Sequence, residues 1–346
     1  MNFKRVLFMV IAILLLAGCS TKEDPALDDS KPKDQAVIKN TDVKNEPSND
    51  EFPLTGIATD AGSEQRAVAV MINNHPEARP QSGLSEADMV YEMLAEGDIT
   101  RFLAIFQSEM PSQIGPIRSA RDYYIELAKG LDCIYVCHGN SPEAKTMLEK
   151  GYIDNLNGLY YDGTLFQRSA DRKAPHNSYT TFEDIQKGAK EKGYELNGAP
   201  EPYAFLTKEE AAGLQGEPAL KTEVSYGSDE YDVQYEYEAT EEKYKRYSNG
   251  EQTVEHKSSK PILLDNILII EAAHQVIDDK GRRKIDLKSG GKGYLLQKGK
   301  ANEVEWVNKD GRIIPVKNDK EVGLIPGKTW VNIIPDEPGL VGDVSF

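Results

Sequence analysis

The chain has 346 residues, of which 39% are hydrophobic and 28% are charged, and its formal net charge is −16 at pH 7. An acidic excess of this size opposes non-specific binding to nucleic acid and to anionic lipid headgroups, so nucleic acid is excluded as an expected ligand. After the first fifty or so residues, nearly 300 remain, which is enough for one large domain or two of ordinary size.

The first nineteen residues predict export and lipidation. Lys4 and Arg5 precede an apolar run of twelve residues at positions 6–17. As a helix this run covers about 18 Å, well short of the roughly 30 Å hydrocarbon core of a bilayer, so it favours a signal peptide over a membrane anchor or a buried helix. The run ends in Leu-Ala-Gly-Cys at residues 16–19, which is similar to the bacterial lipobox.

We therefore predict that residues 1–18 are removed and that Cys19 carries lipid such as palmitate. Acyl chains would then hold the protein on the extracytoplasmic face of a bacterial cell membrane. Residues 19–51 are rich in Asp, Lys, Pro, Asn and Ser and contain few large apolar residues. Such a segment cannot bury enough surface to offset its ordering entropy, which predicts a disordered tether.

From residue 52 the pattern becomes that of a folded chain. Residues 66–72 read as a strand buried on both faces, followed by a polar loop. Residues 88–94 and 99–106 predict a hairpin, with a helix over 87–95 as the alternative.

Two capped helices follow the hairpin. We expect Ser119 to cap a helix that ends near Gly130, and Ser141 to cap a helix that has Pro142 at its first position and ends at Gly151. Between them, residues 133–137 read as a buried strand. The two cysteine sulfurs on this strand would lie about 13 Å apart, too far for a disulfide, so both are expected in the core. Strands alternating with helices predict an α/β layered part over residues 52–195.

Beyond a connector at residues 196–225, the pattern is mostly β. Residues 231–238 alternate tyrosine or valine with polar side chains, residues 248–250 form a turn, and residues 262–271 read as one long apolar strand. Further strands are expected at 293–297, 304–307, 313–316 and 329–334. These elements predict a β-rich part over residues 226–346.

Positive charge collects in the N-terminal part of this acidic chain. In an open α/β layer, the loops that follow strand carboxyl ends converge on one crevice, and helix N-termini favour anions. Arg118, His138 and Ser141 are therefore predicted to face one anionic group, with Arg172, His176 and Asn177 closing over it. The candidate ligand-binding or catalytic residues are Arg118, Ser119, Arg121, His138, Ser141, Arg172, His176 and Asn177.

Three alternatives stay open for these residues. The arginines could pair with carboxylates such as Asp88, Glu92 or Glu96 in a polar network without any ligand. A hydrolase or transferase could use His138 or His176 as general base and Arg118 to stabilise developing charge, although no serine lies in a Gly-x-Ser-x-Gly turn. The third is a metal site formed by His75, His138 and His176 with Asp88 or Glu92, but no short histidine spacing supports it, and neither a metal nor another cofactor is expected.

Several motifs in this chain are distinctive. In the N-terminal part they are residues 79–84, 91–97 with 100–101, 115–121 (Gly-Pro-Ile-Arg-Ser-Ala-Arg) and 174–177 (Ala-Pro-His-Asn). In the C-terminal part they are residues 244–246, the strand that contains Asn266, and residues 327–331. With these motifs, the chain from about residue 52 to its end resembles the YerB-type bacterial lipoproteins.

The resemblance implies an α+β fold, in which an N-terminal α/β layered part with a mixed sheet is intertwined with a β-rich C-terminal part. The family is catalogued as being of unknown function, so the resemblance implies a fold and a location but no activity. We expect a lipid-anchored protein that binds an anionic cell-envelope ligand, such as a phosphorylated glycan or lipid-linked precursor. The alternatives are an enzyme acting on the same ligands and a structural lipoprotein that binds a partner protein.

We predict that Cys19→Ala abolishes lipidation and membrane retention, because the anchor is covalent lipid on that sulfur. Metabolic labelling with a palmitate analogue, followed by membrane fractionation, should mark the wild-type chain alone. Equal labelling of the two chains would show that Cys19 is not the lipidated residue.

Overall fold

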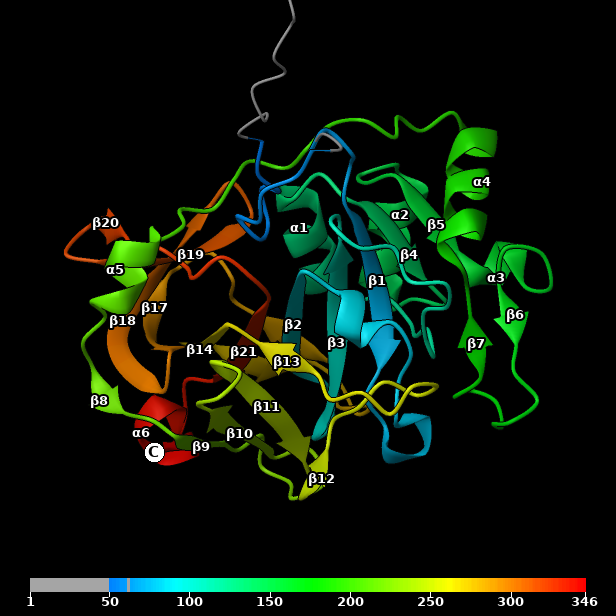
Figure 1. Cartoon of the computed structure of the whole chain (residues 1–346). Helices are drawn as coiled ribbons and strands as arrows, with labels where there is room; N and C mark the ends of the chain where they lie inside the picture. The colour runs from blue at the N-terminus through cyan, green and yellow to red at the C-terminus, as the bar shows by residue number, and fades with distance from the viewer. Residues whose placement is uncertain (1–49, 61–62) are drawn as a thin grey trace, which may run out of the picture. The chain divides into compact units, whose positions relative to one another are not determined.

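The computed structural model describes residues 50–60 and 63–346 (Figure 1). The predicted signal peptide, Cys19 and nearly all of the predicted tether lie outside these residues. Asp50 and Glu51 already belong to the folded part, since they pair with Thr59 and Ala58 through backbone contacts. Within the described ranges, no helix combines the length and the apolar character that a membrane crossing requires.

The N-terminal part contains alternating strands and helices. They are β1 (Val68–Asn73), η1 (Pro76–Ala78), η2 (Leu84–Glu86), β2 (Met89–Glu96), β3 (Ile99–Phe106), α1 (Asp122–Gly130), β4 (Ile134–Cys137), α2 (Pro142–Glu149), β5 (Asn155–Asn157), α3 (Gly158–Tyr161), β6 (Gln167–Arg168), β7 (Ser178–Tyr179) and α4 (Phe182–Lys192). The connector contains α5 (Lys208–Ala212).

The C-terminal part is mostly β, as predicted. Its elements are β8 (Glu217–Pro218), β9 (Lys221–Val224), β10 (Val233–Glu238), β11 (Lys243–Ser248), β12 (Glu251–Gln252), β13 (Leu263–Leu264), β14 (Asn266–Ala272), β15 (His274–Val276), β16 (Arg283–Ile285), β17 (Gly291–Gln297), β18 (Lys300–Lys309), β19 (Arg312–Lys317), β20 (Lys320–Glu321), β21 (Thr329–Pro335), α6 (Gly339–Asp343) and β22 (Val344–Ser345).

One 12-stranded mixed sheet joins the two parts. Its main order is β20-β19-β18-β17-β14-β21-β2-β3-β1-β4-β5, and β8 pairs with β18. The C-terminal strand β21 lies between β14 and the N-terminal strand β2 and runs parallel to both (Figure 1). This shared sheet confirms the predicted α+β fold, in which the two parts are intertwined.

The central strands of this sheet are buried on both faces. Along β1, Ala69 and Met71 contribute to one core, whereas Val68, Val70 and Ile72 contribute to the other. Helix α1 covers the first face. Tyrosines of the second sheet, of order β12-β11-β10-β9-β22 with β13 beside β11, pack on the second.

Most predicted elements are present. Residues 88–94 and 99–106 form the predicted hairpin, as β2 and β3, and not the alternative helix. Two other expectations are wrong in detail. Ser141 caps α2, but Ser119 does not cap α1: the helix starts at Asp122, and the Ser119 hydroxyl donates to the His138 carbonyl. The long strand expected at 262–271 is divided at Asp265, whose carboxylate accepts the Lys328 backbone N–H.

The two cysteines of β4 are free and buried, as expected. Burial raises the pKa of both thiols, because a thiolate in an apolar interior loses its hydration. Cys133 and Cys137 are therefore core residues and not reactive thiols.

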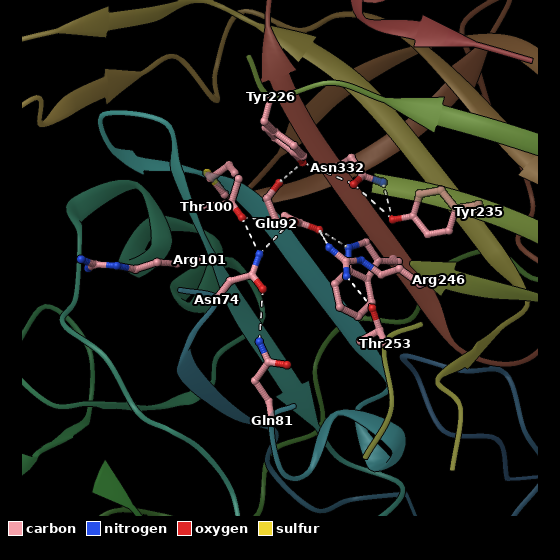
Figure 2. Close-up of polar contacts among 12 residues, drawn as sticks. Asn74, Gln81, Glu92, Thr100, Arg101, Tyr226, Tyr235, Arg246, Thr253 and Asn332 are labelled. Atoms are coloured by element: carbon pink, nitrogen blue, oxygen red, sulfur yellow. Dashed lines mark hydrogen bonds and ion pairs between the residues drawn. The ribbon is translucent and has the colours of Figure 1, made fainter. Parts of the chain in front are cut away.

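A buried ion pair connects the N-terminal part to the second sheet (Figure 2). Glu92 of β2 and Arg246 of β11 are 0% and 1% exposed, and they approach to 2.7 Å. The Glu92 carboxylate also accepts from Trp330 Nε1 at 3.0 Å and from the Thr100 hydroxyl at 3.0 Å. The Arg246 guanidinium lies 4.7 Å from the centre of the Trp330 ring, which adds a cation–π contact.

We predict that Arg246→Ala lowers the free energy of unfolding by about 3–5 kcal/mol, because it leaves the Glu92 charge buried without its partner. Lys245→Ala provides the matched control, since Lys245 is the next residue on β11 and makes an ion pair with Glu238 at the surface. Urea unfolding of the two variants should show a large loss for Arg246→Ala and a small one for Lys245→Ala. Equal losses of unfolding free energy in the two variants would show that the buried pair contributes no more to stability than the surface pair.

Candidate functional site

Five of the eight predicted site residues lie at the carboxyl ends of β1 and β4: Arg118, Ser119, His138, His176 and Asn177. These strands pair in parallel over residues 68–70 and 134–136. Beyond that point, residues 117–120 insert between them: the Arg118 N–H donates to the Met71 carbonyl, and the His138 N–H donates to the Arg118 carbonyl. We call this region, formed by residues 71–77, 117–120, 137–140 and 176–178, the carboxyl edge.

A second segment docks on the first through its backbone. The Ile117 N–H donates to the Ser178 carbonyl at 2.7 Å, and Ile114 exchanges backbone hydrogen bonds with Thr180. A Cβ at Gly115 would lie 2.8 Å from the Ser178 carbonyl oxygen, so the close approach requires glycine there. In this way the Gly-Pro-Ile-Arg motif positions the Ala-Pro-His-Asn motif.

Arg118 differs from the other arginines of the described ranges. Each of the others donates at least one hydrogen bond or forms an ion pair, whereas residues 50–60 and 63–346 give the half-buried Arg118 guanidinium neither. Burial and the like charge of Arg101 lower the pKa of Arg118 to about 10. The group therefore remains cationic at neutral pH, without an anionic partner in the described part of the chain.

The hydrogen bonds of His75 and His176 fix their tautomers. The Glu77 N–H donates to His75 Nδ1 at 3.2 Å, so this nitrogen is an acceptor. The His75 N–H donates to Asn73 Oδ1, which turns the Asn73 amide nitrogen toward His176 Nδ1 at 2.8 Å. Both rings therefore carry their proton on Nε2, the nitrogen that can donate to an anion.

The same residues form a cluster with the composition of a metal site. One ligand atom from each of His75, Glu77 and His176 lies within 4.8 Å of the other two. As bonded here, however, neither histidine has a lone pair on Nε2. Burial lowers the pKa of His176, and the charges of His75, Arg118 and Arg172 lower it further. The Glu77 carboxylate, 3.4 Å from His176 Nε2, would attract a dication, but the positive charges of Arg118 and Arg172 would repel it.

His138 is engaged at both ring nitrogens. Arginine only donates, so the 3.0 Å contact from Arg168 makes Nε2 the acceptor and leaves the proton on Nδ1, which donates to the Ser178 hydroxyl at 2.8 Å. Arg168 is itself held by Asp162 and Asn177. Burial, followed by the charge of Arg168, lowers the pKa of His138. The ring therefore has no free lone pair with which to act as general base on Ser178.

Two predicted residues have structural partners. Arg121 makes an ion pair with Glu96, which Arg101 also contacts at 2.6 Å. Arg172 donates to the carbonyls of Ala78 and Pro80 and thus supports the loop after β1. Arg121 therefore pairs with a carboxylate, as one of the alternatives expected. Arg118 has no such pair among the described residues.

The remaining predicted residues position their neighbours. The Ser141 hydroxyl accepts the Ala144 N–H at the start of α2. Asn177 accepts from Arg168 at 3.1 Å, and Ser119 donates to the carbonyl of His138. Sequence reasoning missed Asn73, although a polar residue at the end of an apolar strand is a signal that could have identified it.

Comparisons with known proteins agree with the fold. The chain matches two family models: the "Protein of unknown function (DUF3048) N-terminal domain" over residues 54–195 and the corresponding C-terminal domain over residues 222–331. It is 50% identical over 287 residues to a protein of Bacillus subtilis (strain 168) that is named "Putative lipoprotein YerB"; the match covers 82% of this chain and 86% of that one. The crystal structure of the YerB protein from Bacillus subtilis superposes with a TM-score of 0.79 at 48% identity, covering 86% of this chain and 99% of the other.

We predict that Arg118→Ala changes the free energy of unfolding by less than about 0.5 kcal/mol when no ligand is present, because the side chain has no partner to leave unpaired. Arg101→Ala is the matched control: Arg101 is buried and bonded to Glu96 and to the Ser119 carbonyl, so its loss should cost about 3 kcal/mol. Urea unfolding of both variants tests the contrast. A cost for Arg118→Ala as large as that for Arg101→Ala would assign Arg118 a structural role.

Proposed function

The chain belongs to the DUF3048 family of YerB-type lipoproteins, and from this premise we propose that it binds an anionic cell-envelope ligand through Arg118 at the carboxyl edge. We further propose that lipid on Cys19 holds it on the extracytoplasmic face of the membrane. The Leu-Ala-Gly-Cys sequence at residues 16–19 and the name of the Bacillus subtilis relative both support this location.

The observation that carries the proposal is the unpartnered charge of Arg118. A half-buried guanidinium loses part of its hydration, and Arg101 adds repulsion. An anion bound there would regain that lost interaction, because charge-assisted hydrogen bonds to arginine are strong when water is partly excluded. The backbone contacts of residues 117–120 hold the main chain of Arg118 in place, so binding has to order only its side chain.

The neighbouring histidines support the same ligand class. Arg118 lowers the pKa of both His138 and His176, so each of the two rings lies within electrostatic range of its guanidinium. The Nε2–H of His75 adds a neutral donor, whereas that of His176 faces the Glu77 carboxylate at 3.4 Å. A phosphoryl group, with several acceptor oxygens, matches one guanidinium together with an N–H donor. We propose binding and not catalysis, because His138 has no free nitrogen for proton transfer.

Inorganic phosphate and pyrophosphate are suitable first probes for the full chain. We predict that about 10 mM pyrophosphate stabilises the wild type by about 1.4 kcal/mol for a Kd near 1 mM, measured as a rise in Tm of a few degrees. Arg118→Ala should lose most of this rise, because it removes the charge that attracts the anion.

Two controls make this experiment specific. Sodium chloride at equal ionic strength separates the effect of screening from that of phosphoryl binding. Lys292→Ala removes one exposed positive charge from β17, far along the sheet order from β1, and should keep the full response. An equal rise in the wild type and in Arg118→Ala, or no rise with either probe, would exclude Arg118 as the anion site.

A further inference from the structure

A separate hollow lies beside α3, next to the carboxyl edge. Its volume is about 400 Å³, within the range of small-molecule sites. Three tyrosines from two segments line it, together with polar side chains: Tyr160, Tyr161, Tyr194, Asn140, Asn155 and Lys192. Residues 140–161 therefore supply most of this surface, which we call the tyrosine hollow.

Tyr160 is the most exposed tyrosine of the hollow, at 66%. Among the described residues, neither its hydroxyl nor that of Tyr161 has a hydrogen-bond partner, so both are available to a ligand. The hydroxyl of Tyr194 is used, since it donates to the Asn155 carbonyl, and Lys192 lies over the Tyr194 ring at 5.8 Å. Tyr194 and Lys192 are thus held in place by each other and by Asn155, while the ring of Tyr160 and the hydroxyls of Tyr160 and Tyr161 can contact a ligand.

The charges that line the hollow balance. Lys145 pairs with Glu149 at 3.6 Å, and Asp154 pairs with Arg66 at 2.6 Å. The ammonium group of Lys192 is directed over an aromatic ring. The hollow therefore offers no uncompensated carboxylate or arginine to select an ionic ligand, in contrast to the carboxyl edge, where Arg118 is unpaired.

The hollow and the carboxyl edge share one turn. The Asn157 side chain caps α3 by accepting the Leu159 N–H, and it also accepts the Gly139 N–H at 3.1 Å. A Cβ at Gly158 would lie 2.3 Å from His138 Nδ1, so the turn packs directly against that ring. A ligand in the hollow would therefore lie beside the proposed anion site.

From these observations we infer that the tyrosine hollow binds an uncharged sugar residue. A pyranose has apolar C–H faces that pack on an aromatic ring, and hydroxyl or acetamido groups that bond to phenol and amide groups at its edge. A protein partner would need a much larger contact, about 800 Å² from each side, whereas the hollow has the size of a small-molecule site. The inference is independent of the proposed anion site, because it concerns an uncharged ligand.

Calorimetric titration of the full chain with the neutral trisaccharide of N-acetylglucosamine tests this inference. The detergent should be an amine oxide, which carries neither sugar nor phosphate. We predict that Tyr160→Ala weakens binding roughly three- to tenfold, the effect of losing one aromatic contact. Tyr160→Phe should bind nearly as well as the wild type, because it keeps the ring.

Tyr152→Ala is the matched control, because Tyr152 is 40% exposed but lines a different cavity, beside α1. It should leave the affinity unchanged. Arg118→Ala should also keep trisaccharide binding, which separates this inference from the anion proposal. The inference is overturned if the wild type does not bind the trisaccharide, or if Tyr160→Ala and Tyr152→Ala weaken binding equally. It is also overturned if Tyr160→Ala abolishes capture of an envelope protein while the trisaccharide does not bind.

Discussion

The fold depends on one buried charge pair. Glu92 of β2 and Arg246 of β11 meet where the two sheets face each other (Figure 2), and Trp330 of β21 donates to the same carboxylate. Burying two charges costs several kcal/mol of hydration, and their attraction returns little more than that cost. The net stabilisation is therefore small, but leaving either charge alone is costly. The pair thus acts as a constraint: other arrangements of these elements would strand a charge, so the intertwined arrangement is selected.

This constraint extends to the carboxyl edge through Asn74. The Asn74 amide donates to Glu92 and, at 2.7 Å, to Thr100, and its oxygen accepts from Arg79 and Gln81. All four contacts hold the loop that follows β1, and this loop also carries His75 and Glu77. The positions of the candidate site residues therefore depend on an arginine of the C-terminal part, although the site residues themselves all lie in the N-terminal part.

Local patterns in the sequence were sufficient for most elements. The apolar run of β1, the hairpin turn after β2 and the serine-proline start of α2 each depend on neighbouring residues alone. Pairings across the chain could not be predicted in this way. Glu92 and Arg246 are 154 residues apart, and nothing local distinguishes Arg118 from Arg121 in one short motif. Only the structure shows that Arg121 has Glu96 as a partner while Arg118 lacks one within the described residues.

The acidic charge of the chain makes the difference between the paired Arg121 and the unpaired Arg118 important for ligand binding. With a formal net charge of −16, the protein repels anions. In physiological salt, however, this electrostatic repulsion decays over about 8 Å. An anion can therefore bind only where a local positive charge is held by the backbone and shielded from carboxylates. At Arg118 the backbone is fixed, because residues 117–120 are held between β1 and β4, and among the described residues no carboxylate forms an ion pair with its guanidinium. The charge of Arg118 therefore stays available to a ligand, whereas Arg101 and Arg121 share Glu96.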